Sequence, residues 1–153
     1  MKKTLLLVVF LLLFSGCEEA VQQSNEHFTV TGNQVTVVDE NITFNIPGDF
    51  TVDENIIEFG PESHIPESPT DGNYKKPAFK LEIIPKRTIE EIPYETEPVV
   101  ETINDHQVIK WSLQAFCYQN RYELVGEKNN ILIRSTTCED HDSETVFTEM
   151  LNS

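Results

Sequence analysis

Positive charge is scarce in this chain. Its 153 residues include 11 lysines and arginines against 26 aspartates and glutamates, which gives a formal net charge of −15. Nucleic acids and anionic lipid surfaces are bound by clustered cationic side chains that displace counterions. The composition therefore argues against nucleic acid as a partner. The acidity itself has two interpretations, which are ordinary solubility and attraction of a cationic ligand or metal.

The chain also lacks an apolar run long enough to cross a membrane. The longest such run, residues 4–14, is about half of the roughly 20 residues that a spanning helix needs. Two lysines precede it, and the small residues Ser15 and Gly16 follow it. This order of basic, apolar and small residues is typical of a cleaved signal peptide. We expect residues 1–16 to be such a peptide and the protein to be exported.

Cysteine is rare, and the first of the three cysteines follows the expected cleavage site directly. Ser15, Gly16 and Cys17 resemble the lipobox of bacterial lipoproteins, in which the cysteine carries a diacylglycerol and becomes the new N-terminus. The resemblance implies lipid attachment at Cys17, with palmitate-type acyl chains holding the protein to a membrane of the cell envelope. The body would lie in the periplasm or at the extracellular face. An ordinary signal peptide followed by an incidental cysteine is the alternative.

The other two cysteines, Cys117 and Cys138, form an even pair. In an exported protein such a pair predicts a disulfide, and one that closes a loop of about twenty residues contributes roughly 3 kcal/mol to stability. A two-cysteine metal half-site is the alternative, but the CxxC spacing typical of such sites is absent.

A hairpin with its turn at residues 126–129 would place the two cysteines directly opposite each other. The same register places Arg121 opposite Arg134, and like charges that face each other cost a few tenths of a kcal/mol, roughly. A shift by two residues would pair Glu123 with Arg134 and leave the cysteines diagonal. Because the disulfide outweighs the charge repulsion, we expect the first register, or a bulge near the open end of the hairpin.

Short alternating runs rich in β-branched residues predict β-strands over most of the body. Polar residues 17–27 show no such pattern, so we expect a lipidated, flexible tether there. Residues 60–77 hold four prolines and two glycines, which predicts a long loop that is either a binding lid or disordered. Residues 88–91 predict one helical turn. The expected strands are residues 28–31, 35–38, 42–46, 50–52, 56–59, 78–84, 99–103, 108–116, 118–125 and 131–138.

The last segment changes to a helical period, with Asp142 or Ser143 placed to cap the helix. We expect this amphipathic helix to pack on one face of an antiparallel β-sheet meander. Residues 28–153 would then form a single α+β domain. The apolar stripe of the helix consists of Val146, Phe147, Met150 and Leu151.

Residues 42–52 form an apolar strand, Pro47, a short turn, Phe50 and a second strand. This order resembles the opening of small bacterial lipoproteins with the PsbP-like fold. Those domains also continue through hairpins to a terminal helix, as the pattern of residues 111–151 does. The resemblance implies an antiparallel sheet flanked by helices and an accessory or binding role, with no catalytic residues to carry over.

No constellation of residues typical of catalysis stands out. A GxSxG nucleophile motif is absent, and the four histidines fall in segments expected to be exposed. The sequence therefore favours a non-enzymatic domain without a cofactor, binding an envelope protein or a small ligand. A hydrolase whose site is assembled from distant residues is one alternative, and a divalent-cation-binding lipoprotein is another.

The weak candidates for a cation site are Asp140, Asp142 and Glu144, which alternate as oxygen ligands do in a calcium loop. Counted from Asp140, however, the segment lacks the glycine and the glutamate that an EF-hand requires at its sixth and twelfth positions. The same acids suit a helix N-terminus. We therefore expect Asp140 and Asp142 to stabilise the helix and to bind no metal.

Overall fold

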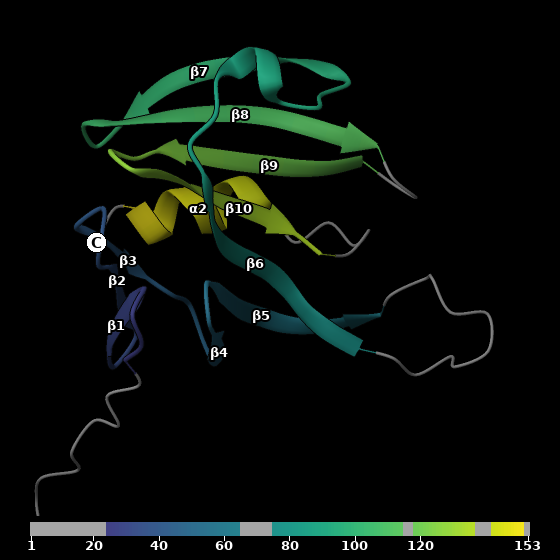
Figure 1. Cartoon of the computed structure of the whole chain (residues 1–153). Helices are drawn as coiled ribbons and strands as arrows, with labels where there is room; N and C mark the ends of the chain where they lie inside the picture. The colour runs from purple at the N-terminus through teal and green to yellow at the C-terminus, as the bar shows by residue number, and fades with distance from the viewer. Residues whose placement is uncertain (1–23, 65–74, 115–117, 137–141, 152–153) are drawn as a thin grey trace, which may run out of the picture.

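The computed structural model describes residues 24–64, 75–114, 118–136 and 142–151. In these residues ten strands form two antiparallel sheets, and one α-helix follows at the C-terminal end (Figure 1). The expected combination of antiparallel β-structure with a C-terminal helix is confirmed.

The smaller sheet consists of β1 (Phe28–Thr31), β2 (Gln34–Val37) and β3 (Ile42–Asn45) in that order. Its residues alternate between buried and exposed positions, as the period of two predicts. Gly32, with a φ of 59°, makes the tight turn between β1 and β2. The buried side chains of this sheet are Phe28, Val30, Val35, Val37, Ile42 and Phe44.

The larger sheet has the order β4-β5-β6-β10-β9-β8-β7. Strands β4 to β6 form successive hairpins, and so do β7 to β10, but β6 pairs with β10 instead of β7. The expected meander therefore holds within each half and not across the junction. The strands are β4 (Phe50–Asp53), β5 (Ile56–His64), β6 (Lys75–Pro85), β7 (Thr96–Ile103), β8 (His106–Gln114), β9 (Tyr118–Val125) and β10 (Asn129–Ser135).

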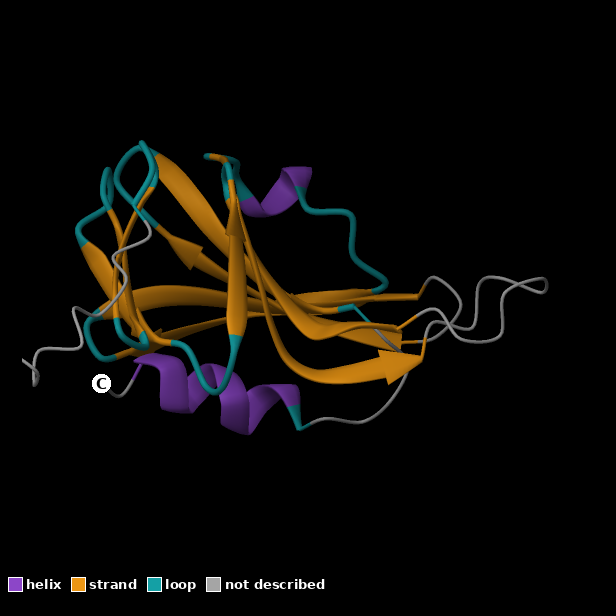
Figure 2. Cartoon of the chain, turned by 90° about the horizontal axis from the view of Figure 1, so that it is seen from below, coloured by secondary structure: helices purple, strands orange, loops and turns teal. Residues whose placement is uncertain are grey.

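The connection from β6 to β7 explains this junction. It contains the 3₁₀ helix η1 (Ile89–Glu91), which begins with a capping box between Thr88 and Glu91. Ile92, directly after η1, is buried in a small cluster with Ile109 and Trp111 of β8. The connection thus crosses one face of the sheet before β7 begins at the far edge. Figure 2 shows η1 and the C-terminal helix on opposite sides of the sheet.

The predicted loop over residues 60–77 is wrong at both ends, because β5 runs on to His64 and β6 begins at Lys75. Gly60 has a φ of 89° and lies where the pairing register of β5 shifts. A bulge tolerates both this conformation and the missing N–H of Pro61. The breakers therefore bend the strand and do not end it.

The helix α2 (Ser143–Leu151) buries Phe147, Met150 and Leu151. Phe147 stacks on Tyr122 of β9, with ring centroids 4.5 Å apart, and the helix also contacts β3 and β10. The predicted cap is confirmed for Asp142, whose carboxylate accepts hydrogen bonds from the Thr145 amide at 3.3 Å and hydroxyl at 2.8 Å. Side chains of α2 and of both sheets belong to one hydrophobic core.

Glu40 ties the two sheets together at a place where the sequence predicted only a turn. Its side chain is buried, and its carboxylate accepts hydrogen bonds from the backbone amides of Glu127, Lys128 and Asn129. These amides belong to the connection between β9 and β10. A side chain at Gly126 would collide with this carboxylate, so the turn needs glycine there.

Candidate functional site

A row of cationic side chains crosses the sheet face that η1 partly covers. Trp111 on β8 lies directly opposite Arg121 on β9, and Arg121 lies opposite Arg134 on β10. Arg134 in turn lies opposite Lys80 on β6, and the row ends at Glu58 on β5. Directly opposed residues in antiparallel strands point to the same face and are about 4.5–5.5 Å apart. The predicted register of the last hairpin, with its two facing arginines, is confirmed.

Three adjacent cations are unexpected in a chain with a net charge of −15. Two of them share one carboxylate: Glu82 lies 3.4 Å from Arg134 Nε and 3.9 Å from Lys80 Nζ. Like charges placed directly opposite each other destabilise a sheet. The arrangement thus carries a cost that strand formation alone does not explain.

Arg121 is the cation of this row that touches no carboxylate within the part of the chain that the structure describes. Its Nη2 donates one hydrogen bond of 3.3 Å to Gln119 Oε1. Burial lowers the pKa of Arg121, and the nearby charges of Arg134 and Arg87 lower that pKa further. The carboxylate of Glu82 opposes this shift. Because a guanidinium stays protonated in proteins, a positive charge with no direct ion pair among the described residues is held in a partly buried place.

Trp111 lies beside this charge and is 3% exposed. The guanidinium carbons of Arg121 and Arg87 lie 5.0 Å and 5.5 Å from the centre of its ring, within the range of cation–π attraction. Over residues 24–64, 75–114, 118–136 and 142–151, three buried side-chain atoms have no hydrogen-bond partner. They are Trp111 Nε1, Arg121 Nε and Asn130 Oδ1.

Two of these three atoms are N–H donors on directly opposed residues. A buried donor without an acceptor costs about 1–3 kcal/mol, and most native structures avoid it. Indole and guanidinium groups can donate but cannot accept. An acceptor-only group such as a carboxylate or a phosphate is therefore the chemical complement of Trp111 and Arg121.

A fully buried carboxylate fixes the neighbouring Arg87. Glu123 is 0% exposed, and its Oε2 lies 2.6 Å from Arg87 Nη2. Arg87 Nε donates to both carboxylate oxygens, and Asn130 Nδ2 donates to Oε1 at 2.8 Å. The geometry is that of a bidentate ion pair supported by a third donor. The sequence did not indicate that the connection carrying Arg87 would cover Glu123.

Two hollows are lined by both Trp111 and Arg121. The larger, with a volume of about 510 Å³, lies on the face that carries η1. Its lining includes Ile84, Arg87, Pro93, Trp111, Arg121 and Leu132.

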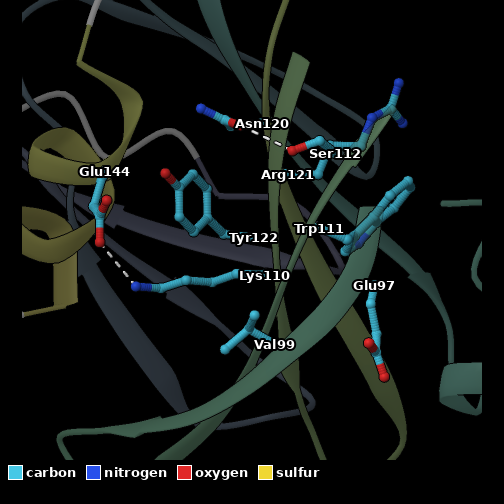
Figure 3. Close-up of a pocket in the computed structure, with 9 residues that line it drawn as sticks. All are labelled: Glu97, Val99, Lys110, Trp111, Ser112, Asn120, Arg121, Tyr122 and Glu144. Carbon is cyan, nitrogen blue, oxygen red and sulfur yellow. Dashed lines mark hydrogen bonds and ion pairs between the residues drawn. The ribbon is translucent and has the colours of Figure 1, made fainter. Parts of the chain in front are cut away.

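The smaller hollow, of about 200 Å³, opens towards α2 (Figure 3). Lys110 points to the α2 side, away from Trp111, and its Nζ pairs with Glu101 at 2.8 Å and Glu144 at 2.9 Å. The hydrogen bond with Glu101 is the main reason that the pKa of Lys110 is raised. The Lys110 ammonium is thus paired directly with protein carboxylates, whereas Arg121 makes no such pair among the described residues.

Of the candidate site residues singled out in the sequence, the structure describes Asp142 and Glu144. Cys17, Cys117, Cys138 and Asp140 are outside the described residues, so the lipid anchor and the disulfide stay predictions. Asp142 caps α2, and Glu144 binds Lys110. The described ranges contain no group of three or more histidine, cysteine, aspartate or glutamate residues that could hold a metal ion.

Comparison of the chain with protein-family models, with curated proteins and with solved structures found no match. Among the helices that the structure describes, none is long and apolar enough to span a membrane.

Proposed function

We propose that this protein is an exported bacterial lipoprotein, held to a membrane of the cell envelope by acyl chains on Cys17. Its body is a non-enzymatic binding domain, with α2 as a layer on one face of the larger sheet and the binding site on the other. The basic, apolar and small residues of the first 17 positions support the anchor. The accessory role that the PsbP-like resemblance implies is compatible with such a domain.

The ligand that we propose is a small anion bound at Trp111 and Arg121. The pair of buried N–H donors without an acceptor carries this proposal. Arg134 and Lys80, the next residues of the row, add positive charge on the same side. This face carries four cations, of which Arg87, Arg134 and Lys80 contact the carboxylates of Glu82 and Glu123 and Arg121 does not.

The overall charge limits the size of this anion. Electrostatic interactions at physiological salt are screened over roughly 8 Å, so the row acts on a group in contact with it. A polyanion would also meet the acidic remainder of a chain whose net charge is −15. The combination favours a small anionic ligand over nucleic acid or an anionic membrane surface.

Binding, not catalysis, is what these groups supply. Arginine and tryptophan side chains orient and neutralise an anion, but neither serves as a general base at neutral pH. Two carboxylates of this face, Glu82 and Glu123, are both engaged by cations. These contacts support a binding domain.

The anchor is tested by Cys17→Ser. Because acyl chains and not the acidic body supply the membrane affinity, this variant is expected to leave the membrane fraction, whereas the wild-type chain stays in it after a high-salt wash. Fractionation with mass determination of the mature N-terminus measures both. A processed Cys17→Ser protein that remains membrane-bound would contradict the anchor.

The anion site is tested by Arg121→Gln. Trp111 is the only tryptophan of the chain, so its fluorescence reports directly on the site. Titration of the full-length chain with phosphate and with acetate should give a saturable change, and Arg121→Gln should weaken binding at least tenfold, since it removes a charge-assisted donor. Lys128→Gln is the matched control, because that exposed lysine pairs with Asp39 away from the site. Equal affinities of the two variants would contradict the proposal.

A further inference from the structure

The larger hollow has the size and lining of a site for an organic molecule. Its volume of about 510 Å³ falls in the range of small-molecule sites, roughly 300–1,000 Å³. Ile84, Pro93, Trp111 and Leu132 supply apolar surface. Leu132 and Trp111 belong to the same buried cluster as Ile92, so the hollow is backed by well-packed side chains.

Charged groups also line the hollow, but most of them are occupied. Lys86 Nζ donates to the carbonyl oxygens of Gly126 at 2.9 Å and Glu127 at 3.2 Å. The carboxylate of Glu91 accepts the Thr88 amide at 2.7 Å. Arg87 is held by Glu123, whereas Arg121 lines the hollow and keeps a buried donor, Nε, without a partner among the described residues. The hollow thus combines a buried, unpartnered donor of Arg121 with an apolar lining.

Building on the proposed anion site, we infer that its ligand is an amphiphilic anion. An oxyanion head group, either a carboxylate or a phosphate monoester, accepts hydrogen bonds from Arg121 Nε and Trp111 Nε1. An apolar body then extends into the larger hollow, over Ile84, Pro93 and Leu132. An inorganic anion would satisfy the donors and leave this apolar surface in water.

The two parts of the ligand make separable contributions to affinity. Each methylene group that leaves water on binding contributes about a fourfold gain in affinity. Two or three buried methylenes therefore strengthen binding by more than about tenfold. A site for the head group alone would show no dependence on the length of the apolar part.

The decisive experiment compares probes that differ in one part at a time. The full-length chain is reconstituted in phosphatidylcholine vesicles that contain no other protein. It is titrated separately with acetate, hexanoate, phosphate, hexyl phosphate and 1-hexanol, and Trp111 fluorescence is followed. We expect hexanoate to bind at least tenfold more tightly than acetate, or hexyl phosphate at least tenfold more tightly than phosphate, with 1-hexanol weaker than either. The better of the two hexyl anions identifies the head group.

The failures of the two proposals are distinguishable. If acetate and phosphate bind as well as their hexyl counterparts, the amphiphile is overturned while the anion site stands. If 1-hexanol binds as well as the hexyl anions, or if no anion binds, both proposals fail.

Variants at the apolar end provide an independent check. Ile84→Ser should reduce the preference for hexanoate over acetate at least fourfold, because it removes apolar surface from the lining of the hollow. Ile56→Ser is the matched control, because Ile56 is partly buried on the same sheet face but does not line the hollow. Equal effects of the two substitutions would overturn the placement of the apolar body. A cooperative urea transition establishes first that each variant is folded.

Discussion

Arg87→Met is expected to lower the free energy of unfolding by about 3–5 kcal/mol, because it leaves the buried carboxylate of Glu123 without its cation. Glu123 is fully buried, and Arg87 reaches it with three hydrogen bonds. Asn130 alone cannot replace a bidentate guanidinium. Equilibrium urea denaturation, followed by Trp111 fluorescence and circular dichroism, measures the loss.

Two further variants define the cause of this loss. Lys128→Met breaks an exposed pair with Asp39, so its effect is expected to be small. The double variant Arg87→Met/Glu123→Leu should recover most of the lost stability, since it removes both buried charges together. If Arg87→Met and Lys128→Met were equally stable, the buried pair would have no special role.

Phe147→Ala is expected to cost about 3–5 kcal/mol, as truncation of a fully buried aromatic side chain usually does. Phe147 is 0% exposed and stacks on Tyr122, so the substitution removes the main contact between α2 and β9. Thermal and urea unfolding both report the change. Glu149→Ala, at an exposed position of the same helix, should change stability by less than about 0.5 kcal/mol. A Phe147→Ala protein as stable as Glu149→Ala would show that α2 is not part of the core.

Local patterns were sufficient to predict most strands and the helix. Period-two alternation located β1 to β3, and the shift to a helical stripe located α2. The register of β9 and β10 was also predictable, because a short turn with glycine leaves few ways to pair the strands. Each of these features depends on residues that are close in sequence.

Features that join distant segments were not predictable in this way. Nothing in the sequence around β6 indicates that it pairs with β10 and not with β7. Glu40 looks like an ordinary turn residue until the backbone amides of residues 127–129 are placed beside it. The ends of the predicted loop were wrong because Gly60 and Pro61 were interpreted as breakers, whereas a bulge accommodates them.

Of the candidate site, the sequence predicted the facing arginines but neither the position of Trp111 nor the hollow. The facing pair of Arg121 and Arg134 follows from the hairpin register, and it was visible as a conflict of charges. That Trp111 lies beside this pair depends on the β8–β9 register. The hollow beneath η1 depends on the path of the β6–β7 connection, for which the sequence carries no local signal. The two arginines that face each other across the predicted β9–β10 hairpin were the one signal in the sequence that could have located the site.

The β6–β10 pairing has a consequence for a chain that emerges from its N-terminal end. The edge of β6 stays open until β10 arrives, and β3 lacks its contact with α2 until the last residues have appeared. The N-terminal strands and α2 contribute side chains to the same hydrophobic core. A chain that has only partly emerged therefore cannot complete this core. This delay would suit the export that we propose, because a polypeptide that is threaded through a membrane has to stay extended until its final segment has passed.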